Sequence, residues 1–142
     1  MATRSARPKR AKRPVLRGIV DVREARGRLV ALEAGAPLPF IPRRCFIIMD
    51  VPRKDIRGEH AHKKLHQYLL CVRGSVRVRL DDGRGRRTVK LSDPSRGLHI
   101  PPMVWAAQYD YSPDAVLVVF ASAKYDAGDY IRDYAEFRRR VR

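Results

Sequence analysis

The sequence predicts an all-β fold, a single closed sandwich or barrel followed by a short C-terminal helix. Short apolar or alternating segments recur between residues 45 and 121, which is typical of strands in such folds. Turn sequences separate these segments, and helical periodicity is confined to the C-terminal segment. This order argues against βαβ units, in which strands alternate with helices.

The length of 142 residues is sufficient for one domain with its own hydrophobic core. We expect residues 1–14 to form a disordered basic arm and residues 15–142 to form a single domain. Residues 15–33 suggest an opening strand pair, and residues 35–42, with three prolines, suggest a loop. No apolar run approaches the ~20 residues of a membrane span, and no apolar segment follows the basic N-terminus. We therefore expect a cytoplasmic protein without a membrane partner.

The predicted strands follow one another from residue 45 onward. Residues 45–51 and 67–72 are nearly continuous apolar runs, which predict buried strands. Residues 75–80 alternate strictly between polar and apolar, which predicts a half-buried strand. The Asp-Gly turn at residues 81–85 predicts a hairpin with a partner strand. That partner and the remaining predicted strands cover residues 87–91, 98–101, 104–109 and 115–121.

The C-terminal segment predicts a helix that Asp126 or Asp129 caps. Tyr130, Tyr134 and Phe137 stand at positions i, i+4 and i+7, so a helix would place them on one face. We expect this face to pack on the barrel or on a second subunit.

The net charge of +16 is concentrated at the ends of the chain. Residues 1–17 hold seven Lys or Arg and no acidic residue, and residues 138–142 hold four Arg and no acidic residue. The basic arm is either a solvated leader or a weak, salt-dependent binding segment for nucleic acid or another anion.

Both cysteines, Cys45 and Cys71, stand in apolar segments. This position predicts two buried, reduced thiols. The sequence contains no CxxC spacing that would indicate a zinc site.

Three of the four histidines fall within residues 57–67. His60 and His62 are two positions apart, so they share one face of a strand. Imidazoles suit zinc, iron and copper, so one hypothesis is a small metal-dependent enzyme that uses His60, His62 and His66. The proline turn at residues 100–108 lacks the later histidine that such a metal site requires.

The second hypothesis is metal-free acid–base chemistry by His60 and His62. An imidazole with a pKa near 6.5 can accept and return a proton at physiological pH. Two adjacent imidazoles can move a proton between neighbouring carbons of a bound substrate. The sequence has no GxSxG, P-loop or GxGxxG motif that would indicate other chemistry.

Three stretches in order, RGEHAHKKLHQYLLCVRGSVRVRLDDG, GLHIPPMVW and VLVVFASAKYDAGDYIRDYAEF, strongly resemble the sugar-nucleotide 3,4-ketoisomerases. The resemblance covers about residues 40–137. It implies a cupin, or double-stranded β-helix jelly roll, as in the related 3,5-epimerases. It also implies an isomerase that converts dTDP-4-keto-6-deoxyglucose to a dTDP-3-keto-6-deoxyhexose through an enediol, without cofactor or metal. Members of this family are usually homodimers.

The resemblance assigns roles to named residues. His60 and His62 match the catalytic histidine pair of the family. The substrate-binding residues that we expect are Arg57, Lys63, Arg77, Arg79 and Trp105. For the arginines the alternative is an ordinary surface charge, and for Trp105 it is a packed barrel residue.

Three positions depart from the family pattern. Ile47 stands where the preceding strand usually has a tyrosine, His66 where the family often has Glu, and Ala106 where it often has His. These departures keep a further hypothesis open, namely a non-catalytic cupin that binds a nucleotide sugar, or nucleic acid through the basic arm.

Overall fold

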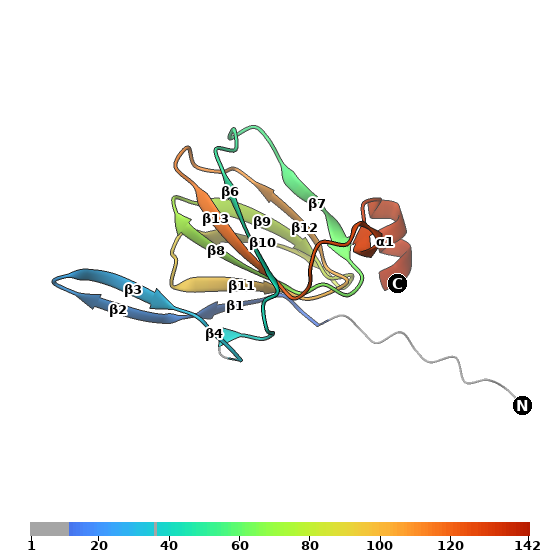
Figure 1. Cartoon of the computed structure of the whole chain (residues 1–142). Coiled ribbons are helices and arrows are strands. Elements are labelled where there is room, and N and C mark those ends of the chain that lie inside the picture. Colours follow the sequence, from blue (N-terminus) through green and yellow to red (C-terminus); the bar gives the residue numbers. More distant parts are fainter. Residues whose placement is uncertain (1–11, 36) are drawn as a thin grey trace, which may run out of the picture.

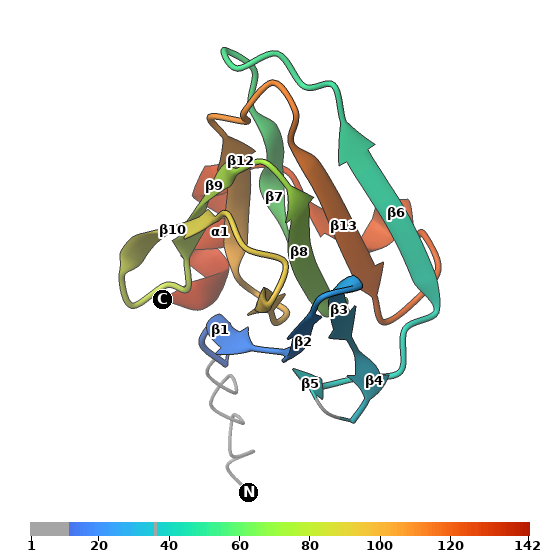
Figure 2. The same cartoon turned by 90° about the vertical axis from the view of Figure 1, so that its left-hand side faces the viewer.

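Two five-stranded antiparallel sheets form the body of this computed structural model, which describes residues 12–35 and 37–142 (Figures 1 and 2). This architecture is the predicted all-β cupin jelly roll. In spatial order, the first sheet holds β1 (Val15–Gly18), β11 (Arg96–Ile100), β8 (Gln67–Arg73), β13 (Val116–Ala121) and β6 (Arg44–Met49). The second holds β10 (Arg86–Leu91), β9 (Val76–Asp81), β12 (Trp105–Tyr109), β7 (Arg57–His62) and β14 (Tyr130–Ile131).

The hydrophobic core lies between the two sheets, because alternate side chains of each strand point inward. On β9 the inward residues are Val76, Val78 and Leu80, all fully buried. On β8 they include Leu69 and Cys71. The sequence pattern placed these strands to within two residues, because alternation and apolar runs are local signals of burial.

The outer face of β6 is exposed and largely apolar. Ile47 and Met49 are each about half exposed, whereas Phe46 and Ile48 pack against the core. Cys45 shares the outward face, so the prediction that it is buried is wrong, although both cysteines are free thiols. Because the neighbours of Cys45 are also apolar, the sequence does not show which side chains of this strand point inward and which point outward.

The N-terminal elements extend beyond the sandwich. β2 (Val20–Glu24) and β3 (Gly27–Ala31) form a hairpin that projects from the body (Figure 1). The short parallel pair β4 (Glu33–Ala34) and β5 (Pro37–Leu38) covers part of the outer face of the first sheet, where Leu38 is buried. Of the predicted arm, residues 1–11 lie outside the described residues, and Pro14 is buried.

The C-terminal segment differs from its prediction. The α-helix is α1 (Tyr134–Val141), and its cap is Asp133, whose carboxylate accepts a hydrogen bond from the Glu136 amide at 2.9 Å. Asp126 caps the short 3-10 turn η1 (Ala127–Asp129) instead. Tyr130 is therefore a strand residue, and the predicted cap at Asp126 or Asp129 is wrong.

The helix packs its aromatic face on the second sheet. Phe137 is fully buried against Ala61 and Ile131, with Trp105 and Tyr134 beside it. This contact fixes β14 to the edge of β7. None of the helices in the described ranges is long and apolar enough to cross a membrane.

We predict that Phe137→Ala destabilises the protein by roughly 3–5 kcal/mol, because truncation leaves a cavity under α1. Urea denaturation monitored by circular dichroism measures the change in the free energy of unfolding. Arg139→Ala is the matched control, since Arg139 is an exposed residue of the same helix. Equal stability of both variants would contradict the packing role of Phe137.

Candidate active site

Two histidines of β7 point into the space between the sheets. His60 is paired with Ala106, which faces the core, while Ala61 between them packs under α1. The ring centroids of His60 and His62 are 4.9 Å apart, and the rings are nearly perpendicular. The alternation of a strand therefore brings together the pair predicted from the sequence.

His62 forms a dyad with Asp129. Its Nδ1 lies 3.2 Å from the Asp129 Oδ2. Because a carboxylate accepts hydrogen bonds, Nδ1 carries the proton and Nε2 carries the lone pair. This Nε2 is enclosed and has no hydrogen-bond partner among the residues that the structure describes. Asp129 is itself held by the backbone amides of Lys64 at 2.9 Å and Leu65 at 3.1 Å.

His60 is oriented by its own strand. Its Nδ1 lies 3.0 Å from the Gly58 carbonyl oxygen, which can only accept, so Nε2 of His60 also carries a lone pair. Gly58 has φ of +85°, and a Cβ there would lie 2.9 Å from Oε1 of Gln108. This glycine thus allows the turn of the backbone that presents its carbonyl to His60.

Tyr130 contacts both histidines. Its ring centroid lies 4.8 Å from that of His60 and 4.4 Å from that of His62. The Arg132 guanidinium lies 4.2 Å from the centre of the Tyr130 ring. A pocket of about 140 Å³ opens beside these groups, lined by Arg44, His62, Lys64, Leu65, Ala123, Lys124, Tyr125, Asp126, Asp129 and Tyr130. Three cations and two tyrosines among these residues suit an anionic ligand with a flat or apolar portion.

The environment keeps both imidazoles neutral. Burial lowers the pKa of His60, and the charge of Arg132 lowers it further, while the hydrogen bond to Gly58 opposes the shift. Burial, then the proximity of His60, lowers the pKa of His62 to about 4, although Asp129 acts in the opposite direction. Two imidazoles this close cannot both be charged readily, so at most one ring of the pair carries a positive charge at a time. A neutral imidazole with a free Nε2 is ready to act as a general base.

Of the predicted substrate-binding residues, two lie on or directly after β7, the strand of the histidine pair. Arg57 is the first residue of β7, and its side chain is exposed. Burial raises the pKa of Tyr111, and the positive charge of Arg57 acts in the opposite direction. Lys63 follows β7, and its Nζ donates to the Gly128 carbonyl at 3.1 Å. Lys63 therefore holds the turn that carries Asp129.

The other three lie on the outer face of the second sheet. Arg77 forms an ion pair with Asp110 at 3.1 Å, and Arg79 stacks over Tyr109. Trp105 packs against the aromatic face of α1. The structure does not bring them to the histidines, because their strand neighbours Val76, Val78 and Ala106 take the inward positions.

The structure also shows where the three positions that depart from the family pattern lie. His66 bonds to His99 rather than to the histidine pair, with 3.0 Å between His66 Nδ1 and His99 Nε2. Ile47 faces outward, so its side chain is not in the site, whereas Ala106 faces inward beside His60. Among residues 12–35 and 37–142, no group of three or more His, Cys, Asp or Glu residues could hold a metal ion.

Sequence reasoning did not predict four residues that lie around the histidine pair, namely Asp129, Tyr130, Arg132 and Gln108. Three of them stand in the segment YDAGDYIRD, where the sequence predicts a helix cap at Asp126 or Asp129 and a helix that includes Tyr130. The useful signal was the third aspartate of the segment, Asp133, which is the actual helix cap. A helix that begins there leaves Tyr130 free to pair with β7.

Comparison with known proteins gives a consistent result. The family model described as "FdtA: WxcM-like, C-terminal" matches residues 13–142. The chain is 44% identical over 118 residues to the TDP-4-oxo-6-deoxy-alpha-D-glucose-3,4-oxoisomerase of Aneurinibacillus thermoaerophilus, covering 83% of this chain and 85% of that protein.

Two solved structures are similar over nearly the whole chain. A histidine-to-asparagine mutant of the 3,4-ketoisomerase QdtA from Thermoanaerobacterium thermosaccharolyticum, in complex with TDP-4-keto-6-deoxyglucose, has a TM-score of 0.87 and 38% identity, covering 90% of this chain and 93% of that one. The TDP-quinovose 3,4-ketoisomerase WlaRB from Campylobacter jejuni has a TM-score of 0.86 and 38% identity, covering 90% and 98%.

The low pKa of His62 predicts how stability depends on pH. Because it falls from 6.5 to about 4 in the folded protein, the unfolded chain takes up a proton that the folded chain does not. The free energy of unfolding therefore decreases as the pH falls from 6.5 towards 4. Urea denaturation between pH 7 and pH 4 should show a smaller decrease for His62→Asn than for the wild type. Contributions from His66 and His99 cancel in this difference, and parallel pH profiles would contradict the predicted shift.

Proposed function

The chain belongs to the FdtA, WxcM-like C-terminal family, and on this premise we propose that it is an isomerase of TDP-4-keto-6-deoxyglucose. The proposed product is a TDP-3-keto-6-deoxyhexose. The observation that carries the proposal is the enclosed, unpartnered Nε2 of His62, with Asp129 bonded to Nδ1 of the same ring. A nitrogen of this kind can accept a proton from a bound substrate.

In the proposed mechanism, His62 Nε2 takes the proton from C3, next to the C4 ketone. The electron pair of the C–H bond forms the C3–C4 double bond, and the π pair of the C4 carbonyl moves to the C4 oxygen. This oxygen takes up a proton to complete the enediol, and the proton that the C3 hydroxyl releases in the second half balances this uptake. The charge that appears on His62 is stabilised by Asp129, which accepts from Nδ1 at 3.2 Å. A carboxylate that is already held by two amides needs no rearrangement during the step.

The second half of the reaction returns a proton to C4. Loss of the proton from the C3 hydroxyl then gives the C3 ketone, so the overall change is an intramolecular rearrangement with no external oxidant. The ring centroid of His60 lies 4.9 Å from that of His62, and its Nε2 also carries a lone pair, which suits it to serve C4 or its oxygen. Protonation of one histidine disfavours protonation of the other, so one acts as acid while the other acts as base.

Arg57 and the cations beside the pocket suit the diphosphate of the substrate. Arg44, Lys64 and Lys124 line the same pocket as His62, and guanidinium groups bind phosphate oxygens in bidentate geometry. Tyr125, which is exposed at this pocket, offers a ring face for the nucleotide base.

A homodimer is the proposed assembly. Val20, Val22 and Leu29 on the β2–β3 hairpin are 60%, 47% and 58% exposed. A projecting two-stranded hairpin is marginally stable by itself, so a second copy that covers these side chains would stabilise it. The aromatic face of α1 is already packed on its own sheet and is not available for this contact.

We expect His62→Asn to lower kcat about 10²- to 10⁴-fold with little change in KM, because it removes the base and keeps the shape of the side chain. The assay is proton NMR with TDP-4-keto-6-deoxyglucose in deuterated buffer, which follows exchange at C3 and the 3-keto product. Asp129→Asn should lower kcat less than His62→Asn does.

Arg79→Gln is the control for that assay, since Arg79 lies on the outer face, and it should retain wild-type rates. Chelator should leave the rate unchanged. Exchange at C3 that persists in His62→Asn would contradict the role of His62, and a folded wild type without exchange or product would overturn the proposed function.

Leu29→Asp should convert the dimer to monomer, because a carboxylate would be buried in the contact. Size-exclusion chromatography with light scattering measures the mass. Arg26→Asp, a charge change in the turn of the same hairpin, should remain dimeric. A monomeric wild type would contradict the proposed assembly.

A further inference from the structure

A second pocket lies apart from the histidine pair, on the outer face of the first sheet over β1, β11 and β8. It encloses about 540 Å³, and four of its lining side chains are cationic, Lys12, Arg13, Arg17 and Arg84. None of the described residues that line it is acidic, so its wall carries a positive potential. The other lining residues are Val15, Pro37, Pro39, Tyr68 and His99.

Tyr68 contributes a buried hydroxyl without a partner. The residue is 2% exposed, and its hydroxyl makes no hydrogen bond within the described part of the chain. Its ring lies directly over Gly97, where a Cβ would come within 2.2 Å of the ring. Arg17 of β1 lies opposite Gly97 of β11. Burial raises the pKa of Tyr68, and the positive charge of Arg17 acts in the opposite direction. A buried hydroxyl of this kind is stabilised when a ligand supplies the acceptor.

His99 also lines this pocket. It stacks on His66, and the bond of 3.0 Å between them requires one ring to donate and the other to accept. When His66 donates, His99 must carry its proton on Nδ1, which leaves that N–H for a ligand. Burial lowers the pKa of both rings, and the positive charge of Lys12 lowers both further. Lys12 therefore lies close to both His66 and His99.

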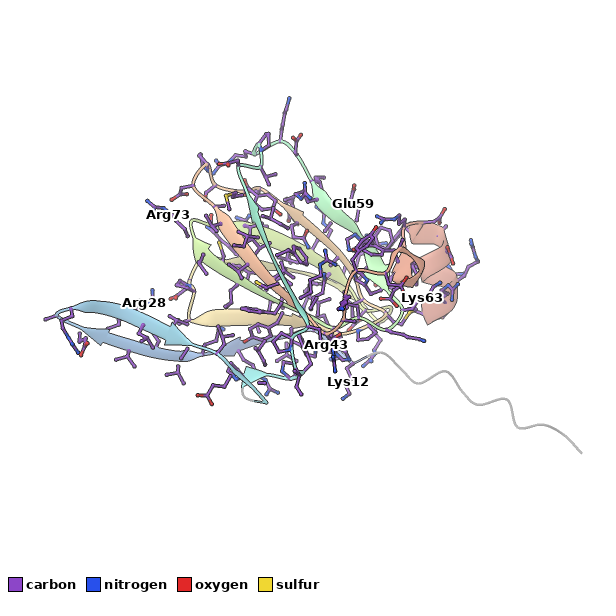
Figure 3. All side chains as sticks on the ribbon, viewed as in Figure 1. Lys12, Arg28, Arg43, Glu59, Lys63 and Arg73 are labelled. Atoms are coloured by element: carbon purple, nitrogen blue, oxygen red, sulfur yellow. The ribbon has the colours of Figure 1, made fainter. Side chains whose placement is uncertain are left out.

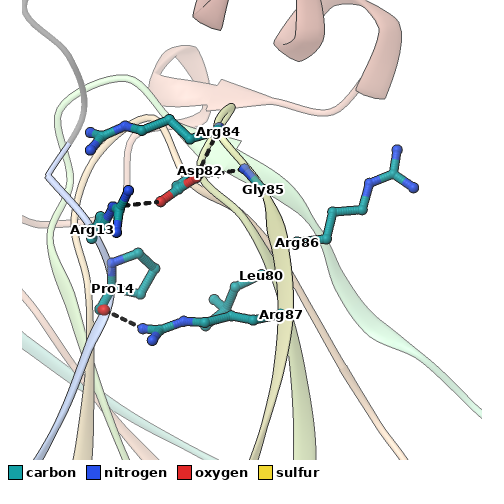
Figure 4. A pocket seen from close by; sticks show the side chains of 8 residues that line it. All are labelled: Arg13, Pro14, Leu80, Asp82, Arg84, Gly85, Arg86 and Arg87. Atoms are coloured by element: carbon teal, nitrogen blue, oxygen red, sulfur yellow. Dashed lines mark hydrogen bonds and ion pairs between the residues drawn. The ribbon is translucent and has the colours of Figure 1, made fainter.

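The wall made by residues 12–14 is anchored to the fold. The Arg87 guanidinium donates to the Pro14 carbonyl, and Arg13 lies 3.9 Å from Asp82 (Figure 4). A smaller adjoining pocket of about 220 Å³ shares Arg13 and Arg84 with the first. The cationic side chains are thus presented by strands and a tight turn as well as by the chain end.

We propose that this pocket binds a small multivalent phosphate-type oxyanion, at a site separate from that of the sugar nucleotide. Guanidinium groups give bidentate bonds to phosphate oxygens, and the Tyr68 hydroxyl supplies a neutral donor, as does His99 in the tautomer in which His66 donates to it. A free diphosphate fits the chemistry better than a nucleic acid strand, because the described lining has no exposed aromatic ring on which bases could stack.

The test is isothermal titration of the full chain with inorganic pyrophosphate, at constant ionic strength and with saturating TDP to fill the sugar-nucleotide site. We expect one binding event per chain and a higher Tm with pyrophosphate. Arg17→Gln should weaken binding at least tenfold. Tyr68→Phe should weaken it severalfold while leaving the Tm of the free protein unchanged or higher, because the removed hydroxyl had no partner.

Arg73→Gln is the matched control, since Arg73 is exposed and lies far from Lys12 (Figure 3). It should bind pyrophosphate as the wild type does, and all three variants should retain isomerase activity. Wild-type affinity in both Arg17→Gln and Tyr68→Phe would overturn the proposal. Binding of a short DNA duplex without binding of pyrophosphate would also overturn it, in favour of a nucleic acid site. Neither result depends on whether the chain is an isomerase.

Discussion

The pairing of β14 with the edge of β7 is the contact on which the site depends. Ile131 lies opposite Ala61, and Tyr130 lies opposite His62. Because side chains alternate along strands, the first pair is packed beneath Phe137 and the second pair faces the interior. The turn that precedes β14 then brings Asp129 to His62. Packing on the outside of the sheet thereby holds the proposed catalytic geometry on its inside.

Burial and one carboxylate set the chemistry of the histidine pair. Desolvation lowers the pKa of both imidazoles, so both are bases at neutral pH. Asp129 opposes this effect at His62 only, which makes the two rings unequal although they stand two positions apart on one strand. An unequal pair can take a proton at one carbon and return it at the neighbouring one, as the proposed function requires.

The N-terminal elements account for the features that the isomerase reaction does not require. The β2–β3 hairpin carries exposed apolar residues, which suit a second copy of the chain. β1 and the residues just before it bring Lys12, Arg13 and Arg17 to the outer face of the first sheet. There they meet Tyr68 and His99, whose side chains point away from the proposed catalytic site because their strand neighbours fill the core.

The sequence by itself determined the strands, the jelly-roll class and the shared face of His60 and His62, since alternation and apolar runs are properties of neighbouring residues. It also carried the family resemblance that the comparisons confirm. Only the tertiary structure decided which long-range partners these residues meet. Asp129 reaches His62 across 67 positions, and His66 turns to His99 instead of completing a three-histidine site. Such contacts depend on strand order and on which sheet face is buried, and no local pattern encodes either.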